Sequence, residues 1–280
     1  MKPFTFLAVF AGFILTSSAQ KIHINTFIGL SNYQGDLQEK RFTFNQSHLA
    51  LGIGASYELT EKLLLRSGIT IGKVAGDDKF NNRNNLRNLN FTSNITEGHL
   101  GFEYYFRNLY DYSVSPYVFA GLAVYHFDPY TKDSAGNKYF LKPLSTEGQG
   151  FLQDKESYNL TQLAIPFGGG VKFALNDNVR LGVEVGVRKL FTDYLDDIST
   201  NYVDQNLLLQ NRGPKAVELA FRGGELKTGI TYPEGGSQRG GSAKKDWYYF
   251  TGLTASFRIG GGGEGNGKFK SGTGCPTKVY

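Results

Sequence analysis

Apolar residues alternate with small or polar residues in eight segments of this chain, a pattern that predicts β-strands with one apolar face. In the clearest segment, Val183 and Val185 alternate with Gly182, Glu184 and Gly186. Each segment has about the length, roughly 9–11 residues, that a tilted strand needs to cross a bilayer. We expect strands at residues 22–30, 49–59, 63–74, 95–106, 117–127, 162–175, 180–188 and 248–259.

The connections between these segments alternate in length. The long ones span 31–48, 75–94, 128–161 and 191–247, and the short ones span 60–62, 107–115 and 176–178. In outer-membrane barrels the short turns are periplasmic and the long loops are extracellular. The pattern therefore predicts an all-β fold, an eight-stranded antiparallel up-and-down transmembrane barrel with long extracellular loops. A soluble sandwich would also alternate along its strands, but its loops need not alternate in length.

The sequence leaves three details of the predicted fold undecided. Segment 117–127 is apolar on both faces, so its orientation in the barrel is not defined. Pro166 lies inside segment 162–175 and predicts a bulge or an edge-like position, because proline cannot donate a ladder hydrogen bond. Within the long loop 191–247, residues 216–221 are a candidate for a short ordered helix or strand.

Composition agrees with a narrow membrane barrel. The chain has 36 glycines, which let strands bend and pack closely, and 17 tyrosines and 22 phenylalanines, which suit aromatic girdles at the two membrane interfaces. Mean hydropathy is −0.31, so any membrane residence must come from strands. The formal charge is +5 with the basic residues scattered, and we therefore expect no nucleic-acid surface.

The first residues predict export. Lys2 precedes an apolar run at 4–15, and Ser17 and Ala19 fit the small-residue positions of a signal-peptidase site. The run is shorter than the ~20 residues of a membrane-spanning helix. We expect a cleaved signal peptide at 1–19, a barrel at 20–259 in the cell outer membrane, in contact with its lipids, and a flexible glycine-rich periplasmic tail at 260–280.

The polar faces of the strands place charged residues in the lumen. An eight-stranded barrel is just wide enough to be filled by its own side chains, and buried charges must be paired. We therefore expect a structural ion-pair network rather than a pore or a proton path. Its members are Glu58, Arg66, Glu97, Glu103, Lys172, Arg180, Glu184, Arg188 and Arg258.

Catalytic and metal chemistry have little support in the sequence. No Ser/His/Asp or Cys/His arrangement is visible, so we expect no enzyme activity and no cofactor. Asp193, Asp196 and Asp197 are weak candidates for calcium ligands at the outer rim, but they lack the glycine and the spacing of an EF-hand loop. A solvated or locally hydrogen-bonded acidic turn is the favoured interpretation.

Several loop segments carry a family resemblance. They are Tyr33-Gln34-Gly35-Asp36-Leu37, Tyr125-His126-Phe127-Asp128-Pro129, Leu141-Lys142-Pro143-Leu144, Thr146-Glu147-Gly148-Gln149-Gly150, Thr192-Asp193-Tyr194-Leu195-Asp196-Asp197 and Cys275-Pro276. Together they resemble the PorG-type outer-membrane barrels of Bacteroidota, which are associated with the type IX secretion system. The resemblance implies a non-catalytic protein-transport component that associates with a periplasmic ring built from a lipoprotein and its partner subunit.

Three functions remain in competition. The first is an interaction protein that anchors or organises secretion machinery through its periplasmic side. The second is a small outer-membrane porin, and the third is a surface adhesin or ligand-binding barrel that uses the long outer loops. For the first function, the distal tail offers cations, aromatics and a proline as a possible periplasmic partner contact: Lys268, Phe269, Lys270, Cys275, Pro276 and Tyr280.

Overall fold

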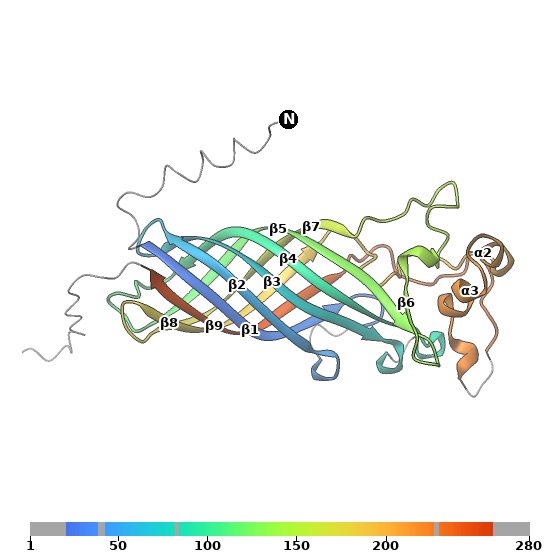
Figure 1. Cartoon of the computed structure of the whole chain (residues 1–280), viewed down its shortest axis with the longest axis horizontal. Helices are drawn as coiled ribbons and strands as arrows, with labels where there is room; N and C mark the ends of the chain where they lie inside the picture. Colours follow the sequence, from blue (N-terminus) through green and yellow to red (C-terminus); the bar gives the residue numbers. More distant parts are fainter. Residues whose placement is uncertain (1–20, 39–42, 82–83, 227–229, 260–280) are drawn as a thin grey trace, which may run out of the picture.

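The computed structural model describes residues 21–38, 43–81, 84–226 and 230–259, in which eight antiparallel strands close into a barrel (Figure 1). Neighbours along the chain are paired, and β1 pairs with β9 to close the sheet. The predicted fold class is therefore confirmed. The barrel strands are β1 (Ile22–Gln34), β2 (His48–Glu58), β3 (Leu63–Asp77), β4 (Asn90–Tyr105), β5 (Val114–Lys132), β7 (Thr161–Ala174), β8 (Val179–Leu190) and β9 (Trp247–Ile259).

The two ends of the barrel differ, as the connection lengths predicted. The short β2–β3, β4–β5 and β7–β8 connections lie at one end, here called the turn end. The long connections gather at the other end, the loop end, where Figure 1 shows the helices standing beyond the barrel. The described residues of these long connections form the loop cap: 35–38, 43–47, 78–81, 84–89, 133–160, 191–226 and 230–246.

The loop cap contains more regular structure than the sequence predicted. Asp204 begins a helix because its carboxylate accepts a hydrogen bond from the Leu207 N–H, and Pro214 begins a second one after Gly213. The second helix overlaps the predicted segment 216–221. Among the described residues, every helix is too short to cross a membrane. The elements are β6 (Lys138–Phe140), α2 (Gln205–Arg212), α3 (Pro214–Ala220), η2 (Phe44–Gln46), η3 (Asp78–Phe80), η4 (Asn85–Arg87), η5 (Lys142–Leu144) and η6 (Gly223–Glu225).

The two faces of the strands separate as the alternation predicted. Outward-facing aliphatic side chains are exposed, whereas their neighbours in the strand point into the lumen and are buried. A continuous apolar outer wall around a polar interior is the architecture of an outer-membrane β-barrel. The outward residues include Ile28, Ile53, Ile69, Leu122, Val183, Val185 and Leu253, exposed by 55, 63, 57, 69, 46, 46 and 58%.

Strand β5 shows why the sequence left its orientation open. Its inward face is aromatic rather than polar, with Tyr117, Tyr125 and Phe127 all at most 1% exposed. The rings of Tyr125 and Phe127 stack with centroids 5.6 Å apart. Aromatic rings fill the lumen here, so both faces of this strand read as apolar.

Several strands exceed their predicted bounds at the loop end. β5 runs to Lys132 instead of residue 127, and β4 begins at Asn90 instead of residue 95. Their ladder continues to the pair Thr92–Tyr130, because hydrogen bonding between strands does not stop where the outward face becomes polar. The β5–β7 ladder has a gap around Pro166, which lacks the N–H that a regular pair requires.

Two buried hydrophobic clusters fill the ends of the barrel. The turn-end cluster consists of Leu64, Tyr105, Leu109, Tyr117 and Phe119. The loop-end cluster joins barrel residues to loop residues, so the loop cap is packed into the mouth of the barrel. Its loop members include Leu37, Leu89, Leu141, Tyr158, Leu195 and Ile198.

Candidate functional site

The predicted lumen charges lie in contact with one another. The Arg66 guanidinium lies 2.9 Å from Glu184 and 3.2 Å from Glu103. All these carboxylates are at most 6% exposed, so each ion pair is removed from bulk water. The remaining pairs are Glu58–Arg180 at 2.8 Å, Glu97–Arg188 at 2.9 Å and Glu103–Lys172.

Tyrosine hydroxyls and histidines complete this network, and the charge count did not predict them. Tyr117 donates to Glu184, Tyr248 to Glu97 and Tyr110 to Glu58, each at 2.7 Å. His23 lies 2.9 Å from Glu58, and His99 lies 3.3 Å from Glu97. Arg258 is placed differently: its guanidinium lies over the Tyr110 ring at the turn end, 5.6 Å from the centroid.

Side chains occupy most of the lumen. A cavity of about 40 Å³ remains beside Arg66, Arg188 and Phe250, which is room for roughly two or three water molecules. Glycine at position 186 leaves room for these side chains, because a Cβ there would lie 2.3 Å from Arg188 NH1 and 3.0 Å from Phe119 Cζ, so that both side chains would have to shift. The lumen is therefore built to be filled by its own ion pairs and rings.

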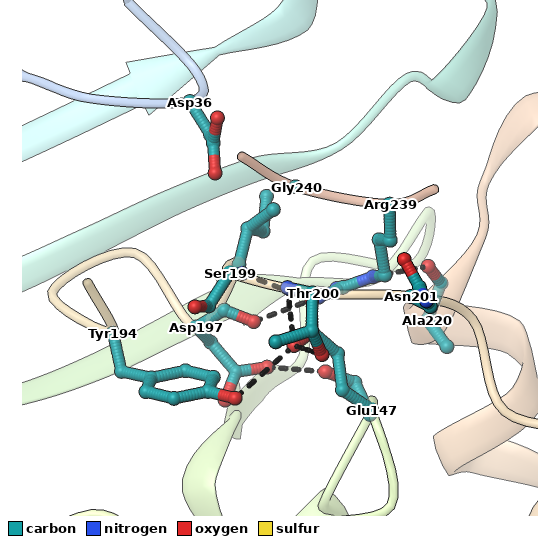
Figure 2. A network of polar contacts seen from close by, with 12 residues as sticks. Asp36, Glu147, Tyr194, Asp197, Ser199, Thr200, Asn201, Ala220, Arg239 and Gly240 are labelled. Atoms are coloured by element: carbon teal, nitrogen blue, oxygen red, sulfur yellow. Dashed lines mark hydrogen bonds and ion pairs between the residues drawn. The ribbon is translucent and has the colours of Figure 1, made fainter. Parts of the chain in front are cut away.

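The loop cap contains a second polar centre, which we call the Glu147 hub (Figure 2). The Glu147 carboxylate is fully buried and accepts hydrogen bonds from the Ser199 and Thr200 N–H groups at 3.0 and 2.9 Å. The Thr200 hydroxyl donates to the same carboxylate at 2.7 Å, and Tyr194 donates at 3.3 Å. One side chain from the third long connection thus fixes a turn of the fourth.

Arg239 is the cation of the hub. Its NH1 group lies 3.0 Å from the Glu147 carboxylate and donates to the Asp197 carbonyl at 2.7 Å. Its Nε donates to the Ala220 carbonyl at 3.2 Å, at the end of α3. The Arg239 carbonyl in turn accepts a hydrogen bond from Arg87 of the second connection. Arg239 therefore links the second and third long connections to two other parts of the fourth.

The first long connection joins the hub through Asp36. The Asp36 carboxylate accepts a hydrogen bond from the Gly241 N–H at 2.9 Å. A Cβ at position 240 would lie 2.6 Å from the Ser199 nitrogen and 2.7 Å from Asp36, so the close approach of these chains requires glycine. The glycine-rich stretch at 235–241 is a packing element of the cap.

A group of carboxyls lies beside the hub. Tyr33 donates a hydrogen bond to Asp196, and its hydroxyl lies 3.5 Å from Asp246. Asp246 also accepts from the Leu195 N–H at 2.9 Å. Asp196 and Asp246 are each 1% exposed, and in the described residues neither carboxyl has a basic side chain as an ion-pair partner.

Burial raises the pKa of several of these carboxyls. It raises the pKa of Asp193 to about 7 and the pKa of Asp197 to about 6, the latter against the opposing effect of Arg239. It also raises the pKa of Asp196 and of Asp246 well above the ordinary value, and repulsion between neighbouring carboxylates adds to the shift. These upward pKa shifts favour the protonated form of the carboxyls in the folded cap.

The acidic turn proposed as a weak calcium candidate is bound by protein donors. Asp197 accepts from Thr146 at 2.5 Å and from Tyr158 at 2.8 Å, and Asp193 accepts from Ser199 at 2.9 Å. Within the described part of the chain, no group of His, Cys, Asp or Glu residues is arranged to hold a metal ion. The turn is hydrogen-bonded as expected, but it is buried at the centre of the cap rather than solvated.

Three of the loop motifs that carried the family resemblance meet at this centre. Tyr33 and Asp36 come from the first motif, Glu147 from another, and Asp196 and Asp197 from a third. Arg239 was missed because it lies in a glycine-rich stretch without hydrophobic periodicity. The candidate signal peptide at 1–19 and the tail residues Lys268, Phe269, Lys270, Cys275, Pro276 and Tyr280 lie outside the described residues.

The chain is also similar to known proteins. Residues 2–211 match the family described as "Domain of unknown function (DUF6089)". No curated protein matches the chain.

Solved structures that resemble the chain do so at low identity. The structure of Neisserial surface protein A has 10% identity and a TM-score of 0.43, covering 85% of this chain and 97% of its own. Ail of Yersinia pestis, in complex with the heparin analogue sucrose octasulfate, has 9% identity and a TM-score of 0.41, with 85 and 98% covered. The outer membrane protein OprG from Pseudomonas aeruginosa has 10% identity and a TM-score of 0.40, with 86 and 98% covered. The fold assignment rests on the chain's own strand pairing.

Proposed function

The chain belongs to the DUF6089 family, and from its structure we propose that it is a non-enzymatic, non-conducting outer-membrane barrel that presents the loop cap as a binding and organising surface. The observation that carries this proposal is the Glu147 hub. Ordering a residue of a loop costs ~1–2 kcal/mol of backbone entropy, so a long loop becomes rigid only where buried contacts offset that cost. A cap held by a buried ion pair is suited to specific recognition.

A location in the outer membrane is supported by the exposed apolar wall. A water-soluble protein would expose an apolar surface of this extent only at a large interface. Aromatic side chains lie on the outer face near both ends of the wall, as interface girdles do. They include Trp247 and Tyr249 toward the loop end, and Tyr104 and Phe106 at the turn end.

A porin is the weaker alternative, because the lumen is occupied by paired charges and aromatic rings. Purified protein in planar bilayers should give no single-channel currents across a range of salt concentrations. Reproducible currents that disappear in a variant with larger lumen side chains would show that the barrel conducts ions.

The finer proposal is association with type IX secretion machinery, including the periplasmic ring lipoprotein and its partner subunit. Its support is the resemblance alone, and the motifs of that resemblance lie mainly in the loop cap. Co-purification from detergent-solubilised envelopes distinguishes two docking modes. Loss of ring subunits after deletion of 268–280 supports periplasmic docking through the tail, and Arg239→Met, which alters the extracellular cap, is the control that should retain them.

If both variants retain the same partners, the turn at 107–115 becomes the candidate contact. Capture of no ring subunits by the full chain removes the secretion role and leaves a surface ligand-binding or adhesion barrel. Heat-dependent gel mobility of each variant shows that the barrel itself is assembled.

A further inference from the structure

The lumen cavity of about 40 Å³ lies between two groups of ion pairs. Arg66 and Glu184, which belong to the group nearer the turn end, both line it. Arg188 also lines it, and this arginine pairs with Glu97 in the group nearer the loop end. The cavity therefore lies where the two groups of lumen charges meet.

Several buried polar atoms of residues that line this cavity have no hydrogen-bond partner among the described residues. One is NH1 of Arg188, because the Glu97 carboxylate accepts only from the Nε and NH2 groups of that guanidinium. Another is the side-chain oxygen of Asn25, whose amide nitrogen donates to the Ser56 hydroxyl at 3.1 Å. A third is the Thr254 hydroxyl. Leaving a buried polar group without a partner is unfavourable, so this concentration at one cavity points to a bound molecule.

The chemistry of these three atoms defines the bound molecule. Arg188 NH1 can only donate a hydrogen bond, the Asn25 oxygen can only accept one, and the Thr254 hydroxyl can do either. The occupant must therefore both donate and accept, and it must fit into about 40 Å³. Water meets both conditions, since one molecule needs ~10–15 Å³ of such a cavity. A halide ion could only accept, and it would share the cavity with the acidic side chain of Glu184.

The strands around the cavity maintain its shape. Asn25 of β1 pairs with Gly54 of β2, and Gly54 pairs with Gly68 of β3, so regular ladders fix this part of the wall. Both glycines line the cavity and add no side chain to it. The space at this level of the barrel is therefore left for a small molecule.

We propose that this cavity is a hydration site, in which roughly two or three ordered water molecules bridge Arg188, Asn25 and Thr254. The same waters contact Arg66 and Glu184, and they join the two groups of ion pairs into one hydrogen-bonded network. The site rests on the barrel fold alone and is independent of what the loop cap binds. It makes water a structural component of the filled lumen.

The first experiment compares two substitutions in β9 that keep the shape of the side chain. Thr254→Val removes the hydroxyl at the cavity, and Thr251→Val is the control, because position 251 shares the outward face with the exposed Leu253. Urea titration of the reconstituted barrel measures the equilibrium constant for unfolding, and heat-dependent gel mobility shows that each variant is assembled. Thr254→Val should raise this constant roughly fivefold relative to Thr251→Val, because one hydrogen bond to water is lost. In a dry cavity the hydroxyl has no partner, so an unchanged or lower constant would overturn the hydration site.

The second experiment identifies the occupant in crystals of the full chain grown in sodium bromide. We expect electron density for water within hydrogen-bond distance of Arg188 NH1 and the Thr254 hydroxyl, without an anomalous bromide signal. A bromide peak in the cavity would overturn the proposal in favour of an anion site. A cavity without density, in a map that shows ordered waters elsewhere, would also overturn it.

Discussion

The lumen and the loop cap both bury charged groups, but they do so by different means. In the lumen, regular strands place acids and bases opposite one another, so that Glu184 meets Arg66 and Glu97 meets Arg188. In the cap, irregular loops gather more carboxyls than cations around Arg239, and backbone N–H groups and tyrosine hydroxyls donate to the rest. Strand periodicity alone produces the first arrangement, whereas the second needs close packing of four distant loops.

The largest expected effect comes from breaking a lumen pair. Glu184→Ala removes the partner that Arg66 contacts through two nitrogens, at 2.9 and 3.2 Å, and the acceptor of the Tyr117 hydroxyl. The free energy of unfolding should fall by ~3–5 kcal/mol, as when one partner of a buried pair is removed, because Arg66 and Lys172 then share the single carboxylate of Glu103. Urea titration of the reconstituted barrel measures this change. Glu156→Ala in the exposed part of a loop is the matched control, and an equal loss in both variants would contradict a paired lumen.

A somewhat smaller effect should follow from charging the outer wall. Val185→Arg places a guanidinium on the lipid face and should destabilise the barrel by ~2–4 kcal/mol near the bilayer midplane. Val185→Leu at the same position should be close to neutral. Normal folding of Val185→Arg in lipid vesicles, measured by the same urea titration, would show that this face does not contact lipid.

The smallest effect is a graded pH dependence of the cap. Carboxyls have a pKa near 3.9 in an unfolded chain, whereas burial raises the pKa of Asp193 to about 7 and that of Asp197 to about 6. The folded cap then holds protons that the opened cap releases, so its stability should fall as pH rises from about 4 through 7.

Hydrogen exchange of residues 193–200, corrected for the intrinsic rate at each pH, measures this trend. Protection should be greater at acidic than at alkaline pH. Asp193→Asn should flatten the dependence, because its amide does not titrate. Protection that increases with pH would show that these carboxyls are stabilised as anions.

The difference between the lumen and the loop cap also explains which parts of the structure could be predicted from the sequence. Period-2 alternation was enough for the barrel, its two faces and the short turns, because each strand repeats one local rule. It left β5 open, where Tyr117 and Phe127 fill the lumen with rings instead of charges. For the cap, motif resemblance drew attention to Glu147 and Asp196, but the role of Arg239 depends on contacts with residues far away in the sequence.

We expect the Glu147 hub to hold the cap in one conformation independently of the lumen. Hydrogen exchange of the reconstituted protein carrying Arg239→Met tests this directly, with Arg107→Met at an exposed turn-end position as the control. Loss of ~3 kcal/mol from a buried pair corresponds to roughly hundredfold faster exchange, which we expect at residues 146–150 and 193–200, with β7 and β8 unchanged. Unchanged exchange in the cap, or an equal loss of protection in the barrel strands, would show that the hub does not hold the cap independently of the lumen.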